Sequence, residues 1–457
     1  MLALLLLAAL AGGCDRSRPP NVLLVVVDTL RADRLGVYGN PDGLTPFLDD
    51  LAQRATVFRN AYAPTSWTCP SVASLLTSRY PSQHHVVSFA SQLAADEVTL
   101  AEALQPARYV GGGFSANFRL LQSLGYAQGF RHWETDAHYE GKMRAEELHR
   151  RAFGWLDGAW TASSAQPALL YVQYMEPHVP YDPPQPFRGR VAPRASAAAD
   201  LVAMNQKLAA MDWLGINRDD VALLESLYDG EVATVDAALR QLFAELERRG
   251  FLQDAIVVVT ADHGEEFREH GGLTHGRTLY NETVRVPLLM VAPGYAGGRM
   301  VEQNVSLLDI APTVVDLLGL PAEPRFEGHS LVPLLAPESW RGRLRAWWRA
   351  TASPADVLFQ LESTESGLDL REHKAGILRR SVKVLMTTGG QPEAYDLQTD
   401  PQEKHANPAA IEADASALAK VLEADRVALD GRSGVAAQAA PLDESTREKL
   451  RALGYHF

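Results

Sequence analysis

Three side chains of the kind that bind metal ions follow apolar runs of this sequence. Asp28 ends the first run, in VVVDTLR, and Asp262 and His263 end a later one, in VVVTADHGEE. Two carboxylates and an imidazole are suitable ligands for one divalent cation, such as manganese, zinc or calcium. Each residue also has a simpler interpretation, because an aspartate at the end of a strand often caps a helix or forms a turn.

The segment Ser66–Pro81 places a hydroxyl group where a nucleophile could work. Pro70 suits the first turn of a helix, and the apolar residues after it form one stripe. Thr68 stands just before this helix, where backbone N–H groups and the helix dipole favour negative charge. An alkoxide needs that environment, and contact with a metal would lower the pKa of the hydroxyl further. The alternative is that Thr68 only caps the helix.

The elements that must position these residues are predicted to be strands of one parallel sheet. Apolar, β-branched runs are typical of strands buried on both faces, and they occur at Asn21–Val27, Ala168–Tyr174, Ala255–Thr260, Val286–Val291 and, more weakly, Tyr109–Ser115. Helical patterns lie between them, at Gly141–Trp160 and Glu231–Arg249. Strands that alternate with helices predict an α/β fold in which ligands lie beyond the carboxyl ends of the strands. The candidate metal ligands would meet there.

The chain of 457 residues is long enough for a large α/β domain and a smaller unit. We expect a main domain at 21–338, a C-terminal subdomain at 339–406 with a strand near Ser381–Thr387, and a helical tail at 407–457. The formal charge of −13, without a dense basic run, argues against a nucleic-acid partner. Two cysteines are too few for a disulfide framework or a cysteine-based zinc cluster.

The first residues have the pattern of a bacterial lipoprotein signal. Residues 1–13, MLALLLLAALAGG, form a short apolar core with small residues directly before Cys14. Cleavage there would leave Cys14 as a lipidated first residue on a tether, 14–20, with the protein anchored to a membrane and facing the periplasm. A plain signal peptide or a misassigned start is the alternative, because no lysine or arginine precedes the apolar core.

From Asn21 on, the chain resembles the sulfatase branch of the alkaline-phosphatase superfamily. The motifs that carry the resemblance include VVVDTLRADRLGVYG, TPFLDDLA, LLTSRYP, YVQYMEPHVPY, TADHGEEFREHG, THGRTLY and SLLDIAPTVVDLLGL, in that order along the chain. The resemblance implies a mostly parallel sheet sandwiched by helices, with a smaller C-terminal α+β subdomain. It also implies one divalent metal ion held by Asp28, Thr68, Asp262 and His263.

The nucleophile motif of that family, Cys (or Ser)-x-Pro-Ser-Arg-x-x-Leu-x-Thr, begins on Thr68 here, and its arginine position falls on Val72. Cys69 is one residue out of register, so we expect no oxidation of this cysteine to formylglycine. Ser115-Ala116-Asn117 stands where sulfatases carry Lys-Trp-His, and His275 stands where they carry a later lysine. The family members with a threonine nucleophile include phosphodiesterases and phosphoglycerol or phosphoethanolamine transferases.

The resemblance also assigns roles around the nucleophile. His178 and His275 become candidates for protonating the leaving oxygen and binding the substrate, with Asn117 and, more weakly, His270 as further substrate contacts. Each histidine has the alternative of an ordinary loop residue.

We therefore expect a hydrolase that cleaves phosphodiesters or phosphonate monoesters through Thr68, acting on a small-molecule, lipid or glycan ester. A sulfatase with an unmodified threonine, a phosphotransferase at the membrane surface and a catalytically silent binding lipoprotein are the alternatives.

The lipid anchor gives the first testable prediction. Metabolic labelling with a radioactive fatty acid should mark the wild-type protein, and Cys14→Ser should abolish the label because the acylated thiol is lost. Cys69→Ser is the matched control and should keep the label. An unlabelled, freely soluble wild-type protein would show that residues 1–14 are not a lipoprotein signal.

Overall fold

The computed structural model describes residues 18–89, 91–136, 142–162, 166–188, 198–209, 215–337, 356–363, 372–387 and 389–407. The expected signal segment, Cys14, the boundary at 338/339 and nearly all of the expected tail lie outside these ranges. No helix within them is long and apolar enough to cross a membrane.

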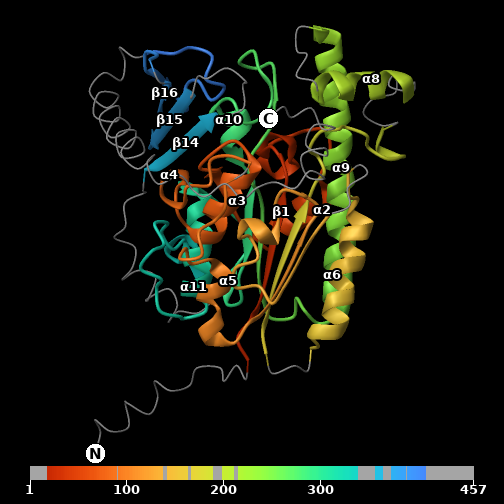
Figure 1. The fold of residues 1–457 in the computed structure, drawn as a ribbon, viewed down its shortest axis with the longest axis vertical. Coiled ribbons are helices and arrows are strands. Elements are labelled where there is room, and N and C mark those ends of the chain that lie inside the picture. Colours follow the sequence, from red (N-terminus) through yellow and green to blue (C-terminus); the bar gives the residue numbers. More distant parts are fainter. Residues whose placement is uncertain are drawn as a thin grey trace, which may run out of the picture.

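A nine-stranded sheet forms the centre of the molecule (Figure 1). The strand order is β12-β2-β10-β6-β1-β5-β3-β4, and β9 also pairs with β2. The strands are β1 (Asn21–Val27), β2 (Thr56–Tyr62), β3 (Val110–Ser115), β4 (His132–Thr135), β5 (Ala168–Tyr174), β6 (Ala255–Ala261), β9 (Arg285–Val286), β10 (Leu288–Val291) and β12 (Arg299–Ser306). The predicted mostly parallel sheet is confirmed, and the predicted strands match β1, β3, β5 and β6 to within one residue.

The prediction was wrong about the direction of one strand. β10 runs antiparallel to both β6 and β2, whereas the apolar run Val286–Val291 was expected to add another parallel strand. A buried apolar run indicates burial on both faces but carries no information on direction. The direction follows from the path of the chain between β6 and β10, which goes through the small hairpin of β7 (Glu266–Phe267) and β8 (Leu273–Thr274).

Helices cover both faces of this sheet. The helices of the described residues are α2 (Pro46–Ala52), α3 (Thr68–Thr77), α4 (Pro81–His84), α5 (Leu100–Ala103), α6 (Ala145–Ala159), α8 (Ala198–Ala209), α9 (Arg218–Arg248), α10 (Asn281–Val284) and α11 (Ile310–Leu317). α6 and α9 lie on one side of the sheet, and α3, α5 and α11 on the other (Figure 1). α9 starts thirteen residues before the predicted helix, at a capping box formed by Asn217 and Asp220.

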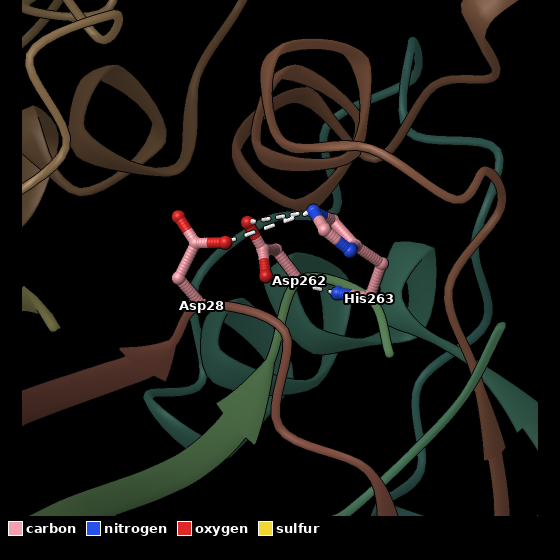
Figure 2. Close-up of side chains that lie close together, drawn as sticks. All are labelled: Asp28, Asp262 and His263. Atoms are coloured by element: carbon pink, nitrogen blue, oxygen red, sulfur yellow. Dashed lines mark hydrogen bonds and ion pairs between the residues drawn. The ribbon is translucent and has the colours of Figure 1, made fainter. Parts of the chain in front are cut away.

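The register between the central strands determines where the candidate ligands emerge. β1 and β6 are parallel neighbours, and Val27 is paired with Ala261. The next residue on each strand is therefore an aspartate, Asp28 or Asp262, at the same edge of the sheet (Figure 2). β5 ends on the other side of β1, with Tyr174 paired to Val27, so the loop after β5 begins at this edge too.

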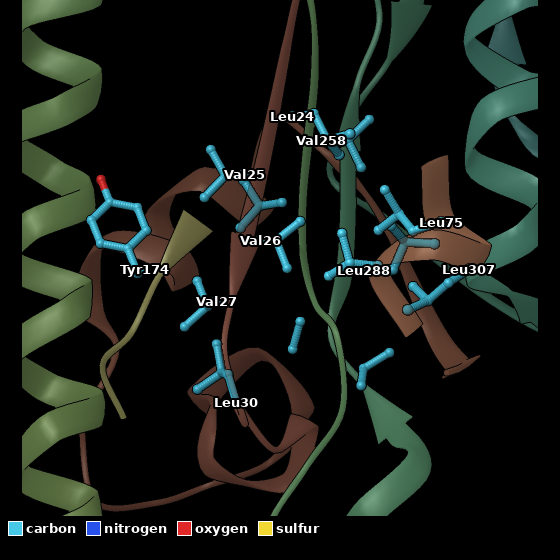
Figure 3. Packing of buried hydrophobic residues seen from close by; sticks show 14 of the residues in the cluster. Leu24, Val25, Val26, Val27, Leu30, Leu75, Tyr174, Val258, Leu288 and Leu307 are labelled. Carbon is cyan, nitrogen blue, oxygen red and sulfur yellow. The ribbon is translucent and has the colours of Figure 1, made fainter. Parts of the chain in front are cut away.

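The core lies on both faces of these strands. Val25 and Val27 of β1 point to the same side as Tyr174, whose hydroxyl lies 2.6 Å from His149 Nε2 of α6 (Figure 3). On the opposite face, Leu75 of α3 packs beside Leu288 and Leu307 (Figure 3). The apolar side chains of β1 therefore pack against helices on both faces of the sheet, as expected for a strand that is buried on both faces.

A four-stranded antiparallel sheet follows in the C-terminal part: β14 (Val357–Ser363), β15 (Glu372–Arg379), β16 (Val382–Thr387) and β17 (Glu393–Asp396). It packs on the main domain through Phe359, which makes an edge-to-face contact with Tyr62 at 5.7 Å between ring centroids. The backbone N–H of Gln360 also donates to the carbonyl of Pro64, at 2.8 Å. The C-terminal sheet therefore shares the core of the main domain.

This shared core gives a prediction for stability. Phe359→Ala should lower the free energy of unfolding by about 3–5 kcal/mol, because a fully buried aromatic ring is lost and a cavity remains. The neighbouring Leu358 is half-buried on the other face of β14, so Leu358→Ala is the control and should be less damaging. Urea denaturation followed by tryptophan fluorescence measures both. Equal losses would contradict the packing of β14 on the main core.

Candidate active site

The four predicted metal-ligand candidates lie together at the carboxyl edge of the sheet. The ligand atoms of Asp28, Asp262 and His263 all lie within 4.8 Å of one another (Figure 2). His263 Nε2 is 3.7 Å from Asp28 Oδ1 and 3.7 Å from Asp262 Oδ2. Thr68 Oγ1 completes the group, 3.2 Å from His263 Nε2 and 3.5 Å from Asp28 Oδ2. The side chains converge as a common cation would require.

Trp67 is the N-cap residue of α3, and Thr68 is the first residue of this helix. Its side chain therefore lies where the unpaired N–H groups of the first helical turn favour negative charge. Cys69, the next residue, belongs to the main hydrophobic core and is 2% exposed. The structure thus brings the threonine, and not the cysteine, to the candidate ligands.

The loop after β1 adopts a strained conformation that orients Asp262. Thr29 has φ 58°, a left-handed value that is uncommon for a β-branched residue. In this conformation its N–H donates to Asp262 Oδ1 at 3.2 Å, and its carbonyl accepts from the hydroxyl of Tyr228 at 2.7 Å. The N–H of His263 donates to the same carboxylate oxygen at 2.9 Å. Strain that persists in this way is a frequent property of functional sites.

The electrostatics of the group fit a bound cation. Burial, reinforced for Asp28 by the neighbouring Asp262, raises the pKa of both carboxyl groups to about 7. Burial and the proximity of His275 lower the pKa of His263 to about 4. Asp28 Oδ1 is buried and has no hydrogen-bond partner among the described residues. A divalent cation would supply the missing positive charge and the missing partner, so the donor set fits a metal ion.

Two further histidines extend the site in a row. The ring of His275 lies 4.5 Å from that of His263, and the ring of His178 lies 4.9 Å from that of His275, between centroids. Burial opposes protonation of His275, but the carboxylate of Glu265, 2.8 Å from its Nδ1, outweighs burial and raises the pKa of His275. Burial and the His275 charge hold the pKa of His178 well below its usual range. His275 is thus suited to carry a proton, and His178 is suited to stay neutral.

Asn117 and His270 were predicted to contact the substrate, and the structure gives both of them other partners. Asn117 Nδ2 donates to Asp28 Oδ2 at 2.7 Å, so this side chain orients a candidate metal ligand. His270 is held at both ring nitrogens, by Glu282 Oε1 at 2.5 Å and the carbonyl of Glu403 at 3.0 Å. Since both nitrogens are occupied, His270 joins the β7–β8 region to the C-terminal segment instead of the cluster.

The sequence reasoning missed two buried polar residues that support the site. Glu265 Oε2 accepts a hydrogen bond from the hydroxyl of Tyr181 at 2.7 Å, and Glu265 Oε1 lies 2.8 Å from Nδ1 of His275. Gln173 Nε2 lies 3.5 Å from Asp262 Oδ2. Signals existed for both, because Gln173 is the polar residue of the apolar run ALLYVQY and Glu265 directly follows the ligand segment ADHG.

Comparison with known proteins agrees with this geometry. Residues 20–320 match the family Sulfatase, and residues 268–425 match the family N-sulphoglucosamine sulphohydrolase, C-terminal. Arylsulfatase A of Homo sapiens is 30% identical over 363 residues, which cover 72% of this chain and 70% of that protein. The multifunctional alkaline phosphatase superfamily protein PehA of Trinickia caryophylli is 25% identical over 414 residues, covering 71% of this chain and 79% of that protein.

Among solved structures, the phosphonate monoester hydrolase of Agrobacterium radiobacter superimposes with a TM-score of 0.72 and 23% identity, over 90% of this chain and 96% of that chain. At this identity the likeness shows the shared fold. The predicted architecture, of the alkaline-phosphatase type, is confirmed.

The raised pKa values predict a pH-dependent response to metal removal. Without a cation, the native state holds protons on Asp28 and Asp262 up to about pH 7, whereas the unfolded chain loses them near pH 4. Below pH 7 a cation must displace these protons, so its stabilising effect should grow as the pH rises from 5 to 8. Thermal unfolding with and without a chelator should therefore show a larger loss of Tm at pH 8 than at pH 5.

Asp28→Asn serves as the control for this measurement. It removes one of the two carboxylates, so the chelator should have little effect on the Tm of the variant at either pH. A chelator effect on the wild type that is equal at both pH values would contradict the assignment of this pair as a metal site.

Proposed function

The chain belongs to the sulfatase family of the alkaline-phosphatase superfamily and is a hydrolase acting on ester bonds, and from this we propose that it cleaves phosphodiesters or phosphonate monoesters through a covalent intermediate on Thr68. The observation that carries the proposal is the position of Thr68 Oγ1, 3.2 Å from His263 Nε2 and 3.5 Å from Asp28 Oδ2. The neighbouring Cys69 is packed in the core.

A threonine nucleophile favours attack at phosphorus for a chemical reason. When Thr68 Oγ1 attacks, the Oγ–P bond forms, the bond from phosphorus to the leaving oxygen breaks, and the leaving oxygen takes a proton. Water then attacks the same phosphorus, the Oγ–P bond breaks, and Thr68 regains its proton. A formylglycine hydrate can instead expel sulfate by collapsing to an aldehyde, which needs a second hydroxyl that threonine lacks.

Each residue of the site has a role in this scheme. Asp28, Asp262, His263 and Thr68 would hold one divalent cation, which when bound lowers the pKa of the hydroxyl and offsets charge on the transferred group. Glu265 faces Nδ1 of His275, so a protonated His275 carries its other proton on Nε2, available to the leaving oxygen. Metal ions are used by sulfatases of this superfamily, and manganese, zinc and calcium all suit the donor set.

The charge of the site favours substrates with one negative charge on the reacting group. Among the described residues, no lysine or arginine side chain forms a hydrogen bond or ion pair with the side chains of Thr68, Asp28, Asp262, His263 or His275. A phosphate monoester carries two negative charges near neutral pH and would need more compensation than a phosphodiester or phosphonate monoester, which carries one.

Sulfate esters are also monoanionic, so sulfatase activity is the second candidate, and the resemblance to arylsulfatase A favours it. A panel of chromogenic 4-nitrophenyl esters with purified protein and added manganese, zinc or calcium separates the two. We expect turnover of the phosphodiester and the phosphonate monoester to exceed that of the sulfate ester and the phosphate monoester. A dominant sulfate-ester activity would make the protein a sulfatase.

Two substitutions test the identity of the nucleophile. Thr68→Ala removes the attacking oxygen, so kcat should fall by about 10³-fold or more. Cys69→Ser keeps the size of the side chain and should leave kcat within about threefold, with a stability loss of about 1 kcal/mol from its buried position. Peptide mass spectrometry should find an unmodified cysteine at position 69. A formyl mass there, with Thr68→Ala active and Cys69→Ser inactive, would reverse the assignment.

A further inference from the structure

A buried ion pair lies outside the metal site and contacts the loop that carries His178. Lys142 Nζ is 3.3 Å from Glu231 Oε1, and the two side chains are 3% and 0% exposed. Lys142 precedes α6, and Glu231 lies within α9. The same ammonium group donates a hydrogen bond to the backbone carbonyl of His178 at 2.7 Å. One lysine therefore joins three segments that are distant in sequence.

A purely structural link between these segments does not explain why the Lys142–Glu231 ion pair is charged. Burying two charges has a large desolvation penalty, so apolar side chains of similar size would stabilise the contact as well or better. The Nζ atom is also closer to the His178 carbonyl, at 2.7 Å, than to the carboxylate it pairs with, at 3.3 Å. The shortest polar contact of the lysine is thus with the peptide group of a histidine of the site.

The other end of this loop is held by the same carboxylate. Glu231 Oε1 accepts from the N–H of Asp182 at 2.9 Å. Tyr181, between the two anchored residues, donates to Glu265, which contacts His275. His178 Nδ1 itself lies 2.5 Å from the carbonyl of Val179, so the ring orientation follows the peptide planes of this loop. Fixing residues 178–182 therefore fixes the ring of His178 beside that of His275.

We propose that Lys142, paired with Glu231, is a positioning residue that fixes the His178 ring against His275, the residue that donates a proton to the leaving oxygen of the ester. The ammonium group of Lys142 is held by Glu231 and by the carbonyl of His178, so it acts through the His178 peptide group. The inference rests on the proposed ester hydrolysis and on the role proposed there for His275 as the proton donor.

The test compares leaving groups. In the substrate class that the wild type turns over best, 4-nitrophenol leaves readily without a proton, whereas phenol needs one. Lys142→Met keeps the length of the side chain and removes its charge and donors. We expect kcat to fall by about threefold or less with the 4-nitrophenyl ester and by about 10–100-fold with the phenyl ester, because a displaced His178 ring no longer holds the neighbouring His275, which then delivers its proton poorly.

The matched control is Lys383→Met. Lys383 is also fully buried and paired with a glutamate, Glu403, at 2.7 Å, but it lies in the C-terminal sheet. Both variants should lose stability in urea, and only Lys142→Met should change the ratio of kcat for the two leaving groups. If Lys142→Met does not fold, Lys142→Met/Glu231→Gln removes both charges, keeps an acceptor for the N–H of Asp182 and is read in the same way.

The outcomes separate this inference from the proposed function. A wild type without turnover of any ester would overturn the proposed hydrolysis and this inference with it. An active wild type whose Lys142 variant loses activity equally for both leaving groups, or not at all, would overturn only the role of Lys142. A changed ratio in Lys383→Met as well would show a general loss of packing and would also overturn it.

Discussion

Two carboxylates buried side by side cannot both carry a full negative charge unless a positive charge lies between them. Asp28 and Asp262 are in this position because they follow paired residues of two neighbouring parallel strands. Nothing in the packing of β1 or β6 requires an acid at these points, since β1 is apolar from Val22 to Val27 and β6 is apolar apart from Thr260. Burial of the pair opposes its ionisation, and a divalent cation bound between the two carboxylates would offset that cost.

Much of the surrounding structure orients the polar atoms of this pair. Backbone N–H groups of Thr29 and His263 hold one oxygen of Asp262, and Asn117 holds one oxygen of Asp28. α3 brings its first residue, Thr68, to the same point while its apolar residues pack on the sheet. The hydrophobic core and the polar cluster therefore depend on the same strand register, because a shift of β6 against β1 would misplace both.

A second layer holds the histidines on the substrate side. Glu265 contacts His275 and Tyr181, and Lys142 and Glu231 hold the loop that contains His178 and Tyr181. These supports come from a segment before α6, from α9 and from the loop after β6, so three parts of the chain must fold before the two rings are fixed.

The sequence by itself determined the strands at 21–27 and 168–174 and, to within one residue, the strand at 255–261, because long apolar runs must be buried. Asp28 and Asp262, directly after two of these strands, mark the edge of the sheet. The sequence also determined Thr68 as the nucleophile candidate, since the spacing to Pro70 sets its place at the start of α3. Only the tertiary structure decided the antiparallel direction of β10, the early start of α9, and the partners of Asn117, His270, Glu265 and Lys142. The physical reason is that burial is encoded locally by side-chain type, whereas strand direction and polar partners depend on which distant segments the folded chain brings together.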